Sequence, residues 1–225
     1  MYHDEVIQSN RFLISKYQGE NTVKLLSEAF QLAAELHSHQ YKTGSGVAVQ
    51  IPSLSHLMEV AGIVLANGGD EVVGSAALLH DCIENIGEHS REVIRERLGE
   101  SVLAIVEECT ESVTLSSLPW KERKQAYLQQ ISTASLPALL IMAADKLQNS
   151  RVLVRRLKLQ GAKGWGRADR ESKLWFKQHL LDTMVNRLGQ LEHEQNQAMV
   201  MGTRLLLAEY AETVQVLMRS QQALG

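Results

Sequence analysis

Two strongly apolar segments, each ending abruptly in ionisable residues, constrain the fold more than any other feature of this sequence. The first, Ala76–Leu79, leads directly into His80 and Asp81, and the second, Leu139–Ala144, leads into Asp145. Ionisable side chains that follow such runs are costly to bury unless they are paired or bound to a metal. The pattern therefore predicts two buried helices that converge on one polar centre.

An alternative stays open at this point for each segment. A histidine next to an aspartate is common by chance in a chain of 225 residues. Asp145 could also cap its own helix or pair locally with Lys146 or Arg151. The apolar runs therefore nominate the three residues without deciding between a metal site and local ion pairs.

Apolar residues recur at three- and four-residue intervals along much of the chain, which is the period of a helical face. There are only three prolines, and no alternating strand pattern of useful length is present. Helices are expected around residues 23–37, 54–66, 70–80, 90–98, 101–106, 121–131, 136–157, 170–188 and 193–219. We predict an all-α bundle of about eight to ten helices. It forms a single domain over residues 1–225, with its core at about 25–185 and a helical C-terminal tail over 190–220.

Composition sets the broad class of the protein. Hydrophobic residues make up 44% and charged residues 22% of the chain, which is typical of a globular domain. The net charge of −3 argues against a dedicated nucleic-acid surface but leaves room for a basic pocket that binds a phosphorylated small molecule. Cys82 and Cys109 form no CxxC pair, which favours a reduced, cytoplasmic setting. No apolar run is long enough to predict a membrane helix.

The residue types at the predicted polar centre suit a metal ion. Imidazole nitrogen and carboxylate oxygen side by side are ligands for a divalent ion of intermediate hardness, which His80 and Asp81 would supply. Asp145 would add a second carboxylate. His56 begins another predicted helix and is a candidate for the second imidazole.

These pieces together resemble a known family. The order is His56-Leu57-Met58-Glu59, then Leu79-His80-Asp81-Cys82-Ile83-Glu84, then Ala144-Asp145-Lys146-Leu147-Gln148-Asn149. It resembles the HD superfamily of phosphohydrolases and, more narrowly, the hydrolase domain of RelA/SpoT proteins and the small single-domain alarmone hydrolases. The resemblance covers residues from about 25 to about 185.

The resemblance implies a metal-dependent active site. One ion, commonly manganese, would be held by His56, His80, Asp81 and Asp145. Four protein ligands leave positions open for water and a substrate oxygen. Glu84 matches the catalytic glutamate of the family, and the resemblance implies removal of the 3′-pyrophosphate from guanosine tetra- or pentaphosphate.

Several positions depart from the family pattern. Asn85 stands where a second catalytic acid is usual, and Lys42-Thr43 replace an Arg-Lys pair near the substrate. Gln148 replaces a histidine that the family often has before the asparagine. Asn149 matches a polar position of the nucleotide pocket. Arg151 begins a cationic run soon after Asp145, which is either a solvated helix face or, through Arg151, a site of phosphate binding. Because the substituted positions are those that would contact substrate, altered substrate preference is one alternative.

Three alternatives to an alarmone hydrolase therefore remain. The chain could hydrolyse another phosphorylated nucleotide or cofactor, or it could be a nucleotide-binding regulator with little turnover. A purely structural helical protein would bind no metal at all. In the first two cases the partner is a small-molecule nucleotide, without nucleic acid or membrane, and the helix over 193–219 could serve a homo-oligomer.

Overall fold

The computed structural model describes residues 23–43, 50–111, 117–166 and 169–222 of the chain. The α-helices are α2 (Lys24–Leu36), α3 (Leu54–Ala66), α4 (Glu71–Leu79), α5 (Cys82–Ile86), α6 (His89–Leu98), α7 (Glu100–Cys109), α8 (Trp120–Ile131), α9 (Leu136–Gln160), α10 (Arg170–Gln190) and α11 (Gln197–Gln222). The prediction of an all-α fold is confirmed. None of the described helices combines the length and hydrophobicity needed to cross a bilayer.

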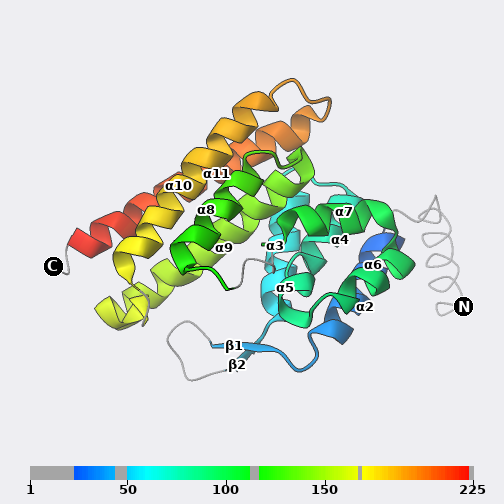
Figure 1. The fold of residues 1–225 in the computed structure, drawn as a ribbon, viewed down its shortest axis with the longest axis horizontal. Helices are drawn as coiled ribbons and strands as arrows, with labels where there is room; N and C mark the ends of the chain where they lie inside the picture. The colour runs from blue at the N-terminus through cyan, green and yellow to red at the C-terminus, as the bar shows by residue number, and fades with distance from the viewer. Residues whose placement is uncertain (1–22, 44–49, 112–116, 167–168, 223–225) are drawn as a thin grey trace, which may run out of the picture.

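The helices form two groups joined by α9. In Figure 1, α8, α9, α10 and α11 run side by side on one side of the molecule, and α2 to α7 gather on the other. The long helix α9 packs against α3, α4 and α7 in one group and against α10 and α11 in the other. Its position makes α9 the element that relates the two halves.

Local sequence explains where α9 begins and why it is buried. Ser135 caps its N-terminus by accepting a hydrogen bond from the Ala138 amide, and Pro137 lies in the first turn, where its missing N–H is not needed. The segment from Ala138 to Ala144 is buried at every position. The helix ends at Gly161, whose φ is +55°. The second apolar run is therefore the inner part of one long helix.

The first apolar run has the same character in α4. Asp70 caps this helix by accepting from the Val73 amide at 3.0 Å, and every residue from Val73 to Leu79 is buried. Small side chains allow α4 to pack closely against α3: a Cβ atom added at Gly74 would lie 2.7 Å from Leu65 Cδ2. Both runs form buried helices, as their sequences predicted.

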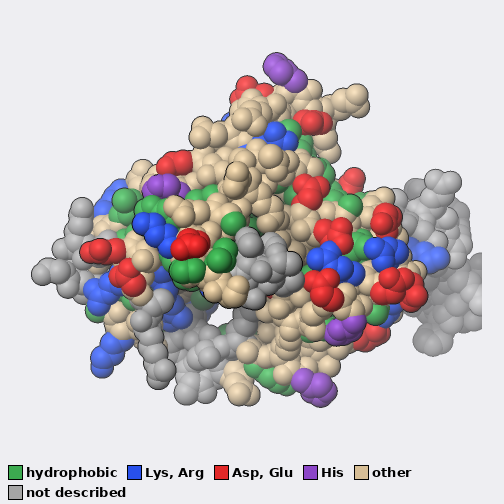
Figure 2. All heavy atoms as spheres, viewed as in Figure 1, with side chains coloured by type: hydrophobic (Ala, Val, Ile, Leu, Met, Phe, Trp, Pro, Cys, Tyr) green, Lys and Arg blue, Asp and Glu red, His purple; other side chains and the backbone are tan. Residues whose placement is uncertain are grey.

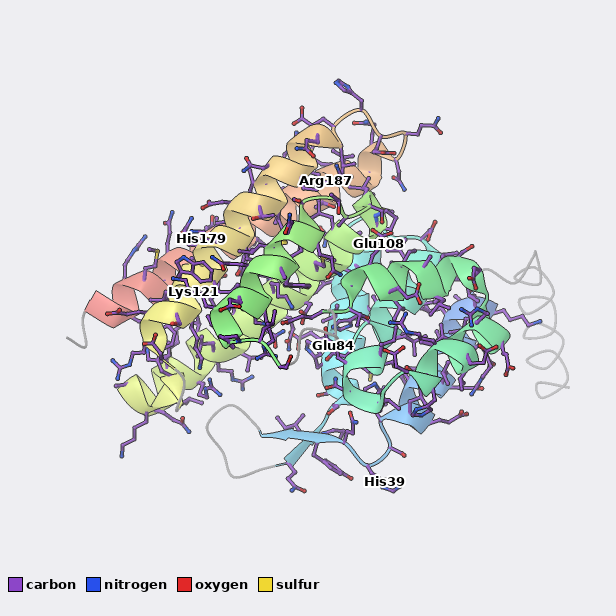
Figure 3. All side chains as sticks on the ribbon, viewed as in Figure 1. His39, Glu84, Glu108, Lys121, His179 and Arg187 are labelled. Carbon is purple, nitrogen blue, oxygen red and sulfur yellow. The ribbon has the colours of Figure 1, made fainter. Side chains whose placement is uncertain are left out.

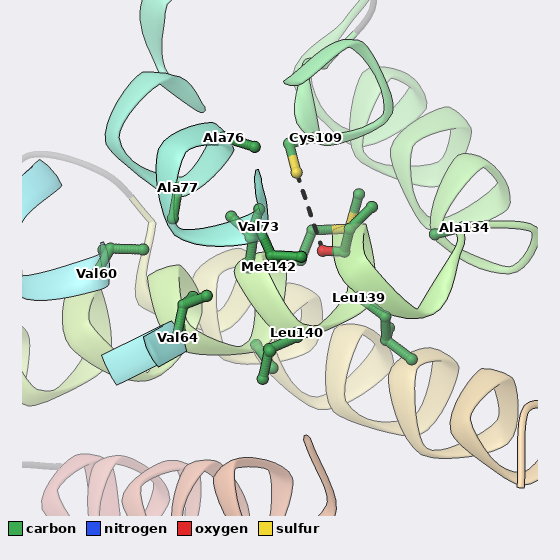
Figure 4. Packing of buried hydrophobic residues seen from close by; sticks show 14 of the residues in the cluster. Val60, Val64, Val73, Ala76, Ala77, Cys109, Ala134, Leu139, Leu140 and Met142 are labelled. Carbon is green, nitrogen blue, oxygen red and sulfur yellow. Dashed lines mark hydrogen bonds between the residues drawn. The ribbon is translucent and has the colours of Figure 1, made fainter. Parts of the chain in front are cut away.

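The C-terminal helix belongs to the same hydrophobic cluster as the rest of the fold. This cluster extends from Ala29 in α2 to Val214 in α11, and Leu206 and Tyr210 contribute to it. Figure 4 shows part of its packing, with the Cys109 thiol directed to the Ala138 carbonyl oxygen. The segment expected as a tail therefore packs into the core.

A small sheet occupies part of the segment expected to be irregular. β1 (Tyr41–Thr43) pairs antiparallel with β2 (Gln50–Pro52), with Lys42 opposite Ile51. Three residues per strand are too few to show an alternating pattern in the sequence. The short helix α5 and the 3-10 helix η2 (Gly161–Trp165) were not expected either.

The molecular surface carries charges of both signs. In Figure 2, acidic and basic side chains intermingle over the face in view. On α6 many of them pair: Arg91 contacts Glu88 and Glu107, and Arg97 contacts Glu28 and Glu35. Exposed pairs of this kind add little stability, typically below about 1 kcal/mol each.

Gly202 in α11 tests how closely this helix packs on α3. A Cβ atom at this position would lie 1.9 Å from the carbonyl oxygen of Asn67, which ends α3. We expect Gly202→Ala to lower the free energy of unfolding by about 1–3 kcal/mol through overpacking. Gly62→Ala, where the added Cβ meets nothing within 4 Å, should instead raise it by roughly 0.5–1 kcal/mol. Urea unfolding measures both, and equal effects would contradict the close contact.

Candidate active site

Four ionisable side chains from three helices converge in the structure. His56 lies in the first turn of α3, His80 and Asp81 directly follow α4, and Asp145 lies within α9. His56 Nε2 is 3.2 Å from Asp145 Oδ1 and 3.7 Å from Asp81 Oδ2. His80 Nε2 is 3.3 Å from Asp81 Oδ1 and 3.8 Å from Asp145 Oδ1. The structure thus brings together all four residues proposed as metal ligands.

Both imidazole rings are held so that Nε2 faces the carboxylates. His80 Nδ1 is 2.8 Å from the Ala77 carbonyl oxygen, which can only accept, so Nδ1 carries the proton. His56 Nδ1 donates to Gln148 Oε1 at 2.8 Å, and the Gln148 amide in turn donates to Glu59 at 2.8 Å. In the neutral rings, each Nε2 therefore offers a lone pair to the site.

These two nitrogen atoms accept no hydrogen bond from the described residues. Among the described residues neither His56 Nε2 nor His80 Nε2 has a hydrogen-bond partner, and both atoms are buried. Ligand atoms of His56, His80 and Asp81 all lie within 4.8 Å of one another. Two buried imidazole lone pairs beside two carboxylates are a donor set that fits a divalent cation.

The two carboxylates make the electrostatic potential within the cluster negative. Burial acts to lower the pKa of His80, but the Asp81 and Asp145 carboxylates outweigh it and raise that pKa to about 9. Burial acts to raise the pKa of Asp145, whereas Lys146 and the two imidazoles hold it well below its usual value. Without metal, the site therefore holds positive charge as a proton; a divalent ion would replace that proton.

Neighbouring side chains fix the orientation of Asp145. Its Oδ2 accepts from Lys146 Nζ, and its Oδ1 accepts from Asn149 Nδ2 one turn later in α9. Lys146 in turn lies over the Tyr127 ring, with Nζ 5.5 Å from the centroid. Asn149, which was predicted to line the nucleotide pocket, therefore contacts the candidate metal site through Asp145.

Glu84 lies beside the cluster on α5, in the turn after His80 and Asp81. Figure 3 shows it where the α5 side of the molecule faces α8 and α9. Its Oε1 accepts a hydrogen bond from the Glu111 amide. Partial burial raises the pKa of this otherwise exposed carboxyl, against smaller opposing effects of that hydrogen bond and of Lys146. A carboxyl group with a raised pKa is suited to proton transfer near neutral pH.

Comparison with known proteins assigns the chain to a family. The family model described as the HD domain matches residues 29–165, which is more than half of the chain. The chain belongs to the HD-domain family. Its relatives include the guanosine-3′,5′-bis(diphosphate) 3′-pyrophosphohydrolase MESH1 of Xenopus tropicalis, 38% identical over 58% of this chain and 70% of that protein. The human MESH1 protein is 36% identical over 61% of this chain and 73% of its own length.

Solved structures agree with this assignment. The structure titled "A metazoan ortholog of SpoT hydrolyzes ppGpp and plays a role in starvation responses" has a TM-score of 0.62 and 26% sequence identity. It aligns with 83% of this chain and 95% of its own. The structure of lmo0812 from Listeria monocytogenes EGD-e has a TM-score of 0.58 at 27% identity, over 71% of this chain and 96% of its own. The HD-domain fold also implies dependence on a divalent metal, and the histidine and aspartate cluster is the candidate site for it.

The predicted substrate and catalytic positions fall in different places in this HD domain. Arg151 does not reach the cluster: its guanidinium pairs with Glu209 of α11. Six residues of helix place it roughly 240° around α9 from Asp145, so it points to another face. Lys42 and Thr43 lie on β1, but their side chains lie outside the described residues. Asn85 follows Glu84, is exposed, and accepts from Gln40 through its backbone oxygen.

The supporting pair Gln148 and Glu59 was not predicted from the sequence. The signal available was helical spacing, because Gln148 follows Asp145 by three residues and shares its helix face, while Glu59 follows His56 by three. Only the packing of α3 on α9 shows that the two faces meet and that the Gln148 amide connects Glu59 to His56.

Gln148 therefore offers a test of the metal site that leaves all four proposed ligands in place. Gln148→Leu removes the acceptor that orients His56, and we expect metal affinity to fall about 10–100-fold. Calorimetric titration with Mn²⁺ measures it. Gln129→Leu, at an exposed position of α8, is the matched control and should bind metal like the parent. Unchanged affinity in Gln148→Leu would show that this hydrogen bond does not support the site.

Proposed function

We propose that this protein is a metal-dependent phosphohydrolase that removes the 3′-pyrophosphate of guanosine 3′,5′-bis(diphosphate). The observation that carries the proposal is the buried cluster of two imidazole Nε2 atoms and two carboxylates, since both nitrogen atoms lack hydrogen-bond partners among the described residues. The substrate is supported by the MESH1 relatives, whose names state this reaction, and by the similar structure whose title states that the protein hydrolyses ppGpp.

Within this proposal His56, His80, Asp81 and Asp145 hold one ion, which we take to be Mn²⁺. When bound, a divalent ion supplies Lewis-acid chemistry at phosphorus. The protein supplies the orientation of the ligands: Ala77 and Gln148 fix the two imidazoles through their Nδ1 protons.

Glu84 is the proposed catalytic carboxylate. It orients the attacking water and takes its proton, for which a raised carboxyl pKa is favourable. Asn85, the other position predicted to be catalytic, can position a polar group but cannot take up a proton. The acid and base roles beside the metal therefore fall to Glu84.

The nucleotide is proposed to lie against Asn149, Lys42 and Thr43. Asn149 is supported by its contact with Asp145. Lys42 and Thr43 rest on their match to family positions and on the location of β1, which leads through β2 into the helix that carries His56. The two buried free cysteines, Cys82 and Cys109, support a reducing, cytoplasmic setting.

The reaction is tested by release of pyrophosphate. Purified protein with Mn²⁺ should hydrolyse guanosine 3′,5′-bis(diphosphate), and Asp81→Ala should abolish turnover because it removes a proposed ligand. Asp182→Ala, an aspartate of α10 outside the cluster, is the control for loss of one carboxylate and should retain activity. A panel of other phosphorylated nucleotides is measured in parallel. Clear turnover of one of these without turnover of the bis(diphosphate) would replace the proposed substrate, and metal binding without turnover would favour a regulatory nucleotide-binding protein.

Glu84→Gln separates proton transfer from metal binding. Because the amide keeps the size of the side chain but cannot accept a proton, we expect kcat to fall about 10²–10⁴-fold. Mn²⁺ affinity, measured by calorimetry, should stay within about twofold, since Glu84 is not a proposed ligand. Glu88→Gln, an exposed residue near the same short helix, should keep normal kcat. A Glu84→Gln protein with normal kcat would exclude Glu84 from catalysis.

A further inference from the structure

A group of positively charged side chains without acidic partners lies between α9 and the beginning of α10. Lys177 and Lys173 lie one turn apart on α10, and Arg156 faces them from α9. We call these three residues the basic cluster. Figure 1 shows the first turns of α10 beside the last turns of α9, and the two helices are in contact. Among the described residues none of the three forms an ion pair with a carboxylate, unlike the arginines of α6.

Among the described residues, the two lysines of the basic cluster donate hydrogen bonds to neutral oxygen atoms, and Lys177 Nζ also lies 6.0 Å from the centroid of the Tyr210 ring. Lys177 Nζ donates to Ser150 Oγ at 2.6 Å, and Lys173 Nζ donates to the Trp165 carbonyl oxygen at 2.6 Å. Burial, followed by the nearby charge of Lys146, lowers the pKa of Lys177 to about 8. Burial and the charge of Arg156 lower the pKa of Lys173. Each ammonium group is therefore less stable as a cation here than it would be in water.

The basic cluster and the neighbouring residue Trp165 each carry one buried N–H group that needs an acceptor. Arg156 Nε and Trp165 Nε1 are buried, and neither has a hydrogen-bond partner among the described residues. Trp165 itself is 1% exposed. A buried N–H group without an acceptor carries its full desolvation cost. The Trp165 side chain packs in a second hydrophobic cluster with Leu157 and Leu174. An anion would therefore complete the Arg156 N–H group and the two ammonium groups, for which no carboxylate partner is found among the described residues.

The basic cluster is connected to the proposed active site through α9. Ser150, the partner of Lys177, follows Asn149, which contacts the metal-site residue Asp145. Ser150 lies roughly 7.5 Å beyond Asp145 along the axis of α9 and roughly 140° around it, whereas Arg156 lies roughly 16 Å along the axis and roughly 20° around it. The Asp145 carboxylate is close enough to Lys177 to act against the lowering of its pKa. An anion at the basic cluster would thus lie near the candidate metal site without contacting the four proposed metal ligands.

We propose that the basic cluster is a second phosphate site, which binds the 5′-diphosphate of the nucleotide while the 3′-pyrophosphate lies at the metal. The identity of this anion rests on the proposed function, since guanosine 3′,5′-bis(diphosphate) carries one diphosphate on each side of its ribose. The basic cluster would make the protein selective for substrates with both groups.

The proposal is tested by varying both the number of 5′-phosphates on the substrate and the charge of the basic cluster. The substrates are guanosine 3′,5′-bis(diphosphate) and guanosine 3′-diphosphate 5′-monophosphate. Lys173→Met/Lys177→Met should raise KM for the longer substrate about tenfold or more, with a much smaller change for the shorter one, because charge-assisted hydrogen bonds to the missing phosphate are lost. Lys158→Met, an exposed lysine of α9, should change neither value. An equal effect on both substrates would overturn the proposal.

Binding of inorganic pyrophosphate tests the basic cluster without catalysis. It is measured by calorimetry without added metal, in an Asp81→Asn background that removes the proposed metal site. Adding Lys173→Met/Lys177→Met should weaken binding about tenfold or more, whereas adding Lys158→Met should not. Equal binding in all three proteins, or none in the background protein, would overturn the second phosphate site. Failure of the wild type to hydrolyse either nucleotide would count against the proposed function alone, since this binding experiment does not depend on turnover.

Discussion

Two carboxylates and two imidazoles share a largely buried space between three helices, and the rest of the structure has to hold them there. Asp145, His56 and His80 are buried, and each Nε2 atom faces carboxylate oxygens at 3.2–3.8 Å. Removing such groups from water costs several kcal/mol per ion unless nearby groups compensate. The helices that carry them must therefore be rigid, and the orientation of each ring must be fixed by a group outside the cluster.

The packing of α3, α4 and α9 meets this requirement with small and apolar side chains. Gly74, Ala76 and Ala77 allow α4 to approach its neighbours closely, and Ala77 also supplies the carbonyl oxygen that orients His80. On the other side, α11 covers α9 and contacts the end of α3 at Gly202. The C-terminal helix therefore contributes to the site indirectly, because it supports the two helices that carry His56 and Asp145.

The sequence allowed the centre of this arrangement to be predicted, but not its surroundings. His80, Asp81 and Asp145 follow apolar runs, so their burial and convergence could be inferred from local patterns. His56 was a candidate from its place at the start of a helix, and the family resemblance was needed to assign it. Arg151 was placed near substrate because it is close to Asp145 in the chain, but helix geometry turns it to α11 and Glu209. Periodicity defines the faces of one helix without showing which face meets which neighbour.

The same limit applies to the basic cluster. Its residues come from the end of α9 and the start of α10, and only the packing of these helices shows that no carboxylate among the described residues pairs with them. Single lysines on a helix usually indicate a solvated face. In this fold they instead lie beside unsatisfied donors at Arg156 and Trp165, which is a property of tertiary structure.

The departures from the family pattern act differently on the two parts of the site. A glutamine at position 148 preserves the metal side, because its carbonyl oxygen can only accept from His56 while its amide donates to Glu59. The proton of His56 is thereby kept on Nδ1 without a second titratable ring. Asn85 has the opposite effect on the substrate side, because an amide cannot exchange protons, and our proposal therefore gives that role to Glu84 alone. The candidate metal site thus keeps its full set of imidazole and carboxylate donors, and under our proposal selectivity for the nucleotide rests on groups farther along α9 and α10.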